Sequence, residues 1–148
     1  MNKPVLPSIA ACAVMALALS ACNQAESPSE VASDVAEAQA DRSEAVADAR
    51  MDQAEVLSDT ASAAASRDPD DRGDAIEDRA EARYDTAIAE ARGDLEVATQ
   101  GCESLSGSAQ ADCKDSAQAT YDSAREGAER ELEAARTRSD QTQQIDNR

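Results

Sequence analysis

Large apolar side chains are scarce in this chain, and this scarcity limits what it can fold into. Residues 22–148, which follow a short apolar run at the N-terminus, hold only 12 valines, leucines and isoleucines among 127 residues. The whole chain has two tyrosines and no phenylalanine or tryptophan. This is far below the roughly 20% that ordinary globular domains need. Alanine, the strongest helix former, supplies 28 of the same 127 residues. We therefore expect an all-α protein built from extended, alanine-rich helices.

The chain is also strongly acidic. Its 31 acidic and 14 basic residues give a formal net charge of −17. A surface of this sign repels phosphate-bearing polymers, so we expect no nucleic-acid partner. The chain has no histidine, and no serine or lysine stands in the context of a known catalytic motif. The sequence therefore predicts no enzyme, no cofactor and no small-molecule substrate.

The N-terminus has the pattern of an export signal. One lysine in the first three residues precedes an apolar run from about Ile9 to Leu19, and this run is too short to cross a bilayer. The run ends in Leu-Ser-Ala-Cys at positions 19–22. This tetrapeptide resembles the lipobox of bacterial lipoproteins.

The lipoprotein resemblance implies an address and an anchor. It implies that residues 1–21 are a cleaved signal peptide, that lipid is attached to Cys22 and that residues 22–27 link the anchor to the folded part. Asn23 follows the cysteine, whereas lipoproteins retained at the inner membrane of enteric bacteria carry Asp there. The resemblance therefore implies the periplasmic face of the outer membrane.

Helix-start signals divide the rest of the chain into segments. Ser27, Pro28 and Glu30 form a capping box with proline at the first helical position, and Asp68 followed by Pro69 repeats this pattern. A Ser/Gly cluster at 104–108 predicts a turn. We expect an acidic helix over 28–66, a helical hairpin over 69–138 and a disordered tail over 139–148.

The two arms of the predicted hairpin each carry one apolar stripe with spacings of three and four residues. If the arms pack antiparallel, facing residues have numbers that add up to 215, and one register aligns both stripes. Tyr84 and Leu132 then lie at one level, and Leu95 and Tyr121 at another. The stripes are Ile76, Ala80, Tyr84, Ala87, Ala91, Leu95, Ala98 and Cys102, and Ala109, Cys113, Ala117, Tyr121, Ala124, Ala128, Leu132 and Ala135.

The cysteines agree with the hairpin register. Cys12 would leave with the signal and Cys22 would carry lipid, so Cys102 and Cys113 would remain as thiols. They face each other beside the turn, in a protein exported to an oxidising compartment, which favours a disulfide. The alternatives are two free thiols, a redox pair or a metal site, although the spacing is not C-x-x-C and further zinc ligands are not evident.

The turn region also resembles a known kind of sequence. Residues 102–113 fit the pattern C-x2-L-x-G-x5-C, which is similar to small alanine-rich exported proteins of Gram-negative bacteria, mostly of unknown function. The resemblance implies a disulfide-linked hairpin and a location in the cell envelope, and no particular activity.

The first predicted helix carries an acidic stripe. Nine acidic residues, three or four positions apart, lie on one helix face with no basic residue among them. They form either a surface for a cation or a basic partner, or a solvated face that keeps the helix from aggregating, and we favour the second. The nine are Glu30, Asp34, Glu37, Asp41, Glu44, Asp48, Asp52, Glu55 and Asp59.

A weak apolar flank runs along the same helix. This flank could dock on the hairpin to make a three-helix bundle, dock on another chain, or do neither. It consists of Val31, Val35, Ala38, Ala49, Val56 and Leu57.

The segment that begins at Asp68 matches a calcium-binding EF-hand loop only in part. Asp68, Asp70 and Gly73 match three positions of an EF-hand loop, but Arg72 and Arg79 stand where anionic ligands belong. We expect no metal site.

Two function classes fit these patterns. The first is a lipid-anchored envelope lipoprotein that acts as a structural or protein-interaction module, through an envelope protein or through self-association. The alternative is an acidic regulatory binder, an adapter or inhibitor of a basic envelope enzyme.

Overall fold

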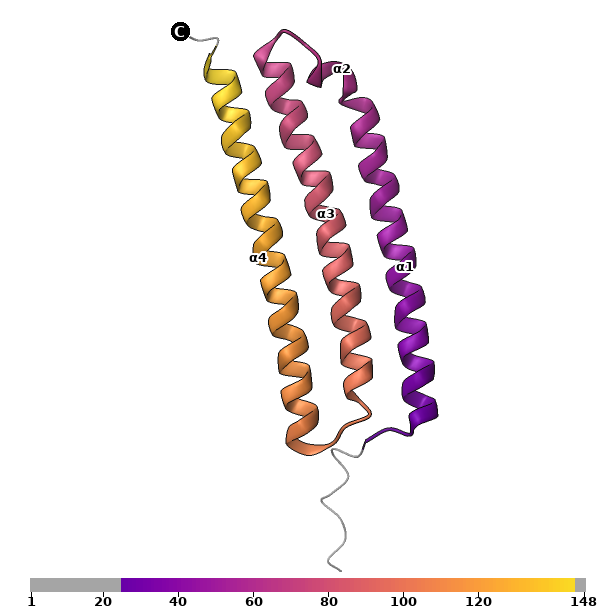
Figure 1. The fold of residues 1–148 in the computed structure, drawn as a ribbon. Helices are drawn as coiled ribbons and strands as arrows, with labels where there is room; N and C mark the ends of the chain where they lie inside the picture. The colour runs from indigo at the N-terminus through magenta and orange to yellow at the C-terminus, as the bar shows by residue number, and fades with distance from the viewer. Residues whose placement is uncertain (1–24, 146–148) are drawn as a thin grey trace, which may run out of the picture.

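The computed structural model describes residues 25–145 (Figure 1). The predicted signal peptide, Cys22 and residues 146–148 lie outside these described residues. All regular structure in the described part is helical and no strand occurs there, which confirms the predicted all-α class. Its helices are α1 (Pro28–Asp59), α2 (Ala61–Ala64), α3 (Pro69–Cys102) and α4 (Gly107–Ile145).

The helices begin where the capping signals predict. The Ser27 hydroxyl accepts the Glu30 N–H at 3.3 Å, and the Glu30 carboxylate accepts the Ser27 N–H at 3.1 Å. Hydrogen bonding of the Glu30 carboxylate by Ser27, first by its side chain and then by its backbone N–H, lowers the pKa of Glu30. At α3, the Asp68 carboxylate accepts the Asp70 N–H at 3.0 Å. Each cap satisfies helix-end donors and contributes about 1 kcal/mol to helix stability.

The predicted helix over 28–66 is interrupted at Thr60. The Thr60 hydroxyl donates to the Val56 carbonyl at 2.6 Å and accepts the Arg79 Nε–H of α3 at 2.7 Å. A hydroxyl that bonds back to the preceding turn bends a helix, and Arg79 fixes this one in place. The segment therefore forms α1 and the one-turn helix α2 instead of a single helix.

Helices α3 and α4 form the predicted antiparallel hairpin. The turn between them uses Gly107, whose φ of 63° lies in the left-handed region that glycine favours. The paired residues have numbers that add up to between 213 and 217, so the predicted register of 215 is confirmed. These pairs are Cys102 with Cys113, Glu103 with Lys114, Glu77 and Glu81 with Arg136, and Asp74 with Gln143.

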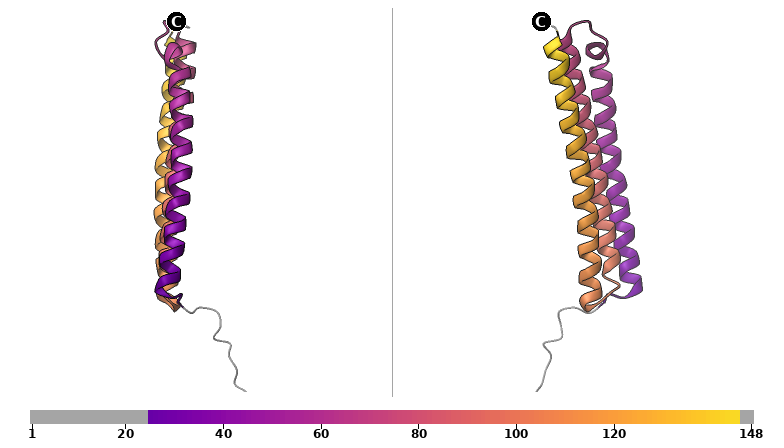
Figure 2. Two further views of the ribbon diagram at one scale, coloured as in Figure 1. Left: turned by 90° about the vertical axis from the view of Figure 1, so that its right-hand side faces the viewer. Right: turned by 60° about the vertical axis from the view of Figure 1, so that its left-hand side comes forward.

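Helix α1 packs against α3 and leaves α4 untouched. Arg50 pairs with Glu90 at 2.7 Å, and the Thr86 hydroxyl donates to Gln53 Oε1 at 3.1 Å. Within residues 25–145, α1 and α4 make no contact with each other. Seen edge-on, the helices form a layer one helix thick with α3 in the middle (Figure 2). The acidic helix therefore docks on the hairpin, but as the edge of a flat layer and not as part of a closed three-helix bundle.

Small side chains dominate the buried positions. Ten hydrophobic residues are buried in the described part, and six of them are alanine. The predicted stripes were wrong at three positions, because Ala98, Ala109 and Ala124 are exposed. Ile88, which the predicted stripe left out, is buried. It lies four residues after Tyr84 and three before Ala91, so it shares their side of α3.

The disordered tail predicted over 139–148 was wrong for residues 139–145. Helix α4 continues to Ile145, and Ser139 is only 2% exposed. Gln143 lies over Gly73, where a Cβ would stand 2.7 Å from Gln143 Cγ, and it donates to the Asp74 carboxylate at 3.1 Å. Small and polar residues therefore extend the contact with α3 beyond the last apolar residue of the stripe.

Gly93 allows the close contact between α1 and α3. A Cβ at Gly93 would lie 2.3 Å from Arg42 Cγ, so we expect Gly93→Ala to lower the free energy of unfolding by about 1–2 kcal/mol despite its gain in helix propensity. Gly127 in α4 is the matched control, since only the end of the Arg130 side chain, at 3.9 Å, is near its Cβ position. We expect Gly127→Ala to raise stability by about 0.5–1 kcal/mol. Denaturant unfolding of both variants tests this, and equal stabilisation by both would contradict it.

Candidate functional site

The cysteines beside the turn are joined. Cys102 and Cys113 form a disulfide with a Cα–Cα distance of 5.8 Å, and Cys102 is only 1% exposed. The predicted pairing is thus present in the structure, and the alternatives of free thiols or a thiolate metal site do not fit it. The bond ties the last residue of α3 to the second turn of α4.

Glu103, the residue after the disulfide, connects three parts of this end of the molecule. Its carboxylate accepts the Gln110 side-chain N–H at 2.6 Å and pairs with the Lys114 ammonium. Its backbone carbonyl accepts the Glu26 N–H at 2.9 Å. The segment before α1 is therefore fastened to the α3–α4 turn.

Carboxylates crowd at the same end. The pKa of Glu26 is raised, first because neighbouring atoms displace water from its carboxylate and then because Asp34, Glu103 and Glu30 lie nearby, while Lys114 opposes the rise. This end therefore favours the neutral form of Glu26 more than open water does.

The predicted acidic stripe lies at the surface, with only Asp34 half-buried. Its members border grooves between α1 and α3. One groove is lined by Asp52 and Asp59 of α1 together with three acidic residues of α3, and Val56 also lines it. We call this the acidic groove, and its carboxylates are Asp52, Asp59, Asp78, Glu81 and Asp85.

The α3 members of the acidic groove were missed by the sequence analysis. Asp78, Glu81 and Asp85 follow each other at three and four residues, the same spacing that marked the stripe on α1. Applied to α3, that spacing would have found them. A second groove nearer the disulfide brings Glu96 of α3 beside members of the α1 stripe, Asp34, Glu37 and Asp41.

Basic residues offset part of this charge. Arg136 of α4 binds Glu81 at 2.9 Å and Glu77 at 3.2 Å, and the hydrogen bond to Glu81 is the main cause that raises the pKa of Arg136. Within residues 25–145, Glu81 is the one carboxylate of the acidic groove that forms an ion pair, and the other four form none.

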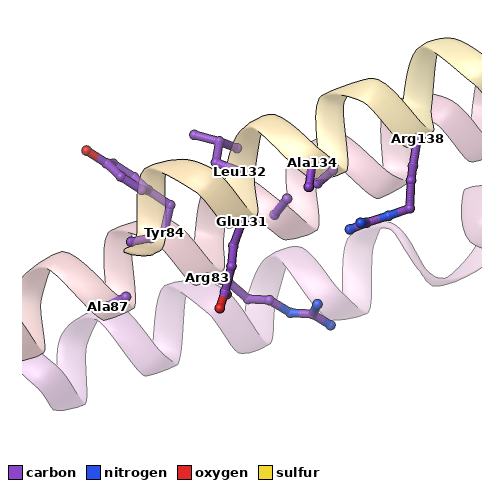
Figure 3. Close-up of a pocket in the computed structure, with 10 residues that line it drawn as sticks. Arg83, Tyr84, Ala87, Glu131, Leu132, Ala134 and Arg138 are labelled. Carbon is purple, nitrogen blue, oxygen red and sulfur yellow. The ribbon is translucent and has the colours of Figure 1, made fainter. Parts of the chain in front are cut away.

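A further groove lies between α3 and α4 (Figure 3). Alanines from both helices line it, together with Tyr84 and Leu132, which the register predicted at one level. Arg83, Glu131 and Arg138 are its charged residues. The groove is thus lined by small and apolar side chains together with these three charged ones, and it has one more cation than anion.

Two further kinds of site are absent from residues 25–145. No group of three or more carboxylate or thiol side chains is placed to hold a metal ion. Asp68 of the partial EF-hand pattern caps α3 through its carboxylate. None of the described helices combines the length and the apolar character needed to cross a membrane.

Comparison of the chain with protein-family models, with curated proteins and with solved structures gave no match.

The disulfide should be a main source of hairpin stability. Closing a loop of this size contributes on the order of 3 kcal/mol in the chain-entropy description. We expect reductant to lower the melting temperature of the oxidised protein, measured by circular dichroism. The double variant Cys102→Ala/Cys113→Ala should melt at the same temperature with and without reductant. Unchanged melting of the unmodified protein on reduction would show that the bond does not stabilise the hairpin.

Proposed function

We propose that this chain is a lipid-anchored lipoprotein of the bacterial envelope that acts as a structural or protein-interaction module and not as an enzyme. The observation that carries this proposal is the lipobox-like Leu-Ser-Ala-Cys at 19–22, a few positions before the start of α1. Dual acylation is sufficient for stable anchoring, since each buried CH₂ contributes about 0.8 kcal/mol. We place the protein on the periplasmic face of the outer membrane.

The shape of the molecule supports a module that reaches or spaces. Helix α3 has 34 residues and α4 has 39, which at 1.5 Å per residue corresponds to roughly 50 and 60 Å. The flat layer presents long helix surfaces on both sides (Figure 2). Long surfaces of this kind suit contacts with an envelope protein or with a second copy of the chain.

Lipidation can be tested at one residue. We expect Cys22→Ser to abolish incorporation of a labelled fatty acid and to release the protein from the membrane fraction, because the acceptor sulfur is gone. Cys12→Ser is the control, since it lies within the proposed signal peptide and should leave labelling unchanged. Labelled Cys22→Ser protein would refute the lipobox interpretation.

The alternative function is an acidic regulatory binder, and the acidic groove is the observation that favours it. Carboxylates from α1 and α3 line one groove, so a basic helix or loop could contact both helices together. Such docking would be electrostatic, and it would weaken steeply as salt rises.

The regulatory alternative predicts a site-specific loss of binding. We expect the triple variant Asp52→Asn/Asp78→Asn/Asp85→Asn to lose a partner that crosslinks to the unmodified protein in intact cells. The control changes the same number of charges on exposed residues of α4, Asp112→Asn/Asp115→Asn/Asp140→Asn. Equal loss of the crosslinked partner from both variants would argue against docking in the groove. So would an amount of captured partner that does not change with salt concentration.

A further inference from the structure

The segment before α1 fixes which end of the molecule lies near the proposed anchor. Glu26 is hydrogen-bonded to the carbonyl of Glu103, and Cys22 lies four positions before Glu26. A fully extended chain spans at most about 3.6 Å per residue, so the two residues can be separated by roughly 14 Å at most. That distance is short beside the length of the layer, so the α3–α4 turn lies close to any lipid on Cys22.

We propose that the α3–α4 turn rests on the membrane surface and places the side chain of Leu105 in the interface, while the opposite end of the layer projects away from the lipid. This inference rests on the proposed lipidation of Cys22. The partner of the turn is therefore a lipid surface, and the orientation of the whole molecule follows from it.

The composition of the turn suits such a contact. Residues 104–111 carry no charge and form the longest uncharged run within residues 25–145, in a chain whose net charge is −17. Within residues 25–144 only three large hydrophobic residues are exposed, and Leu105 is one of them, at 38%. A leucine at a membrane interface buries apolar surface that it otherwise exposes to water.

The turn is also held firmly enough to present Leu105. The Leu105 N–H donates to the Cys102 carbonyl at 3.0 Å, and Cys102 is bonded to Cys113. The ammonium of Lys114 pairs with Glu103, which offsets one of the carboxylates at this end. The disulfide thereby gives the base of the molecule a fixed shape.

The opposite end has no large apolar residue within its uncharged run. Residues 60–66 are also uncharged, but they contain only threonine, serine and alanine. Leu57 lies close to that end of α1 and has the same exposure as Leu105, 38%. Leu57 is therefore a matched reference position for Leu105.

Tryptophan fluorescence tests the proposal directly, because the chain has no native tryptophan. Purified lipidated Leu105→Trp and Leu57→Trp proteins would be placed in phosphatidylcholine vesicles, with and without bromine on the acyl chains. We expect a blue shift on membrane binding and loss of emission with brominated lipid for Leu105→Trp, and neither effect for Leu57→Trp. Vesicle flotation and helicity would be measured on the same samples.

Each other outcome would overturn the proposal in a recognisable way. Quenching at both positions would mean that the layer lies flat on the membrane. Quenching at neither, with flotation retained, would mean that the protein is anchored but its turn does not touch lipid. Failure of both proteins to carry lipid and to float would overturn the proposed function together with this inference.

Discussion

Close approach of helix backbones along seams of small side chains is the interaction on which the rest of this structure depends. Without phenylalanine or tryptophan, and with few large aliphatic residues, the helices cannot gather around a common core. They gain contact through length instead. Helix α3 carries one seam on each side: Ala82 and Gly93 lie against α1, whereas Ala80 and Ala87 line the groove with α4.

Because α3 supplies both seams, α1 and α4 depend on it and not on each other. A typical domain packs two layers of secondary structure around one core, and this molecule has a single layer. Ion pairs such as Arg42 with Asp94 and Arg50 with Glu90 cross from α1 to α3. Exposed pairs of this kind contribute about 0–1 kcal/mol each, so they help to set the register more than the stability. On the α4 side, the Cys102–Cys113 bond adds a covalent link.

Much of this fold could be predicted from the sequence because its signals are local. The caps at Ser27 and Asp68 bind backbone groups two or three residues away, and the hairpin register follows from two stripes joined by a short turn. The end of α4 could not be predicted in this way. Ser139 and Gln143 are polar, and their burial or contact depends on a neighbouring helix that begins about 70 residues earlier in the chain.

The acidic groove, too, could be predicted only in part from local sequence signals. The stripe on α1 was visible as a sequence pattern, but its neighbours Asp78 and Asp85 join it only through the docking of α1 on α3. The weak apolar flank of α1 did not indicate which surface it would contact. Cys22, the residue that carries the proposed function, lies outside the described residues, so its role rests on the sequence motif alone.

The most direct test of the central claim, that α3 separates α1 from α4, is a pair of distances between spin labels. Exposed positions at one level of the layer, as the contacts between neighbouring helices place them, are Glu55 on α1, Arg83 on α3 and Arg130 on α4, and each would be labelled through a cysteine in a Cys22→Ser background. The flat layer predicts that the distance from 55 to 130 exceeds that from 55 to 83 by about one helix spacing, roughly 8–10 Å. Equal distances would mean that α1 and α4 touch in a closed bundle, and would contradict the single-layer structure.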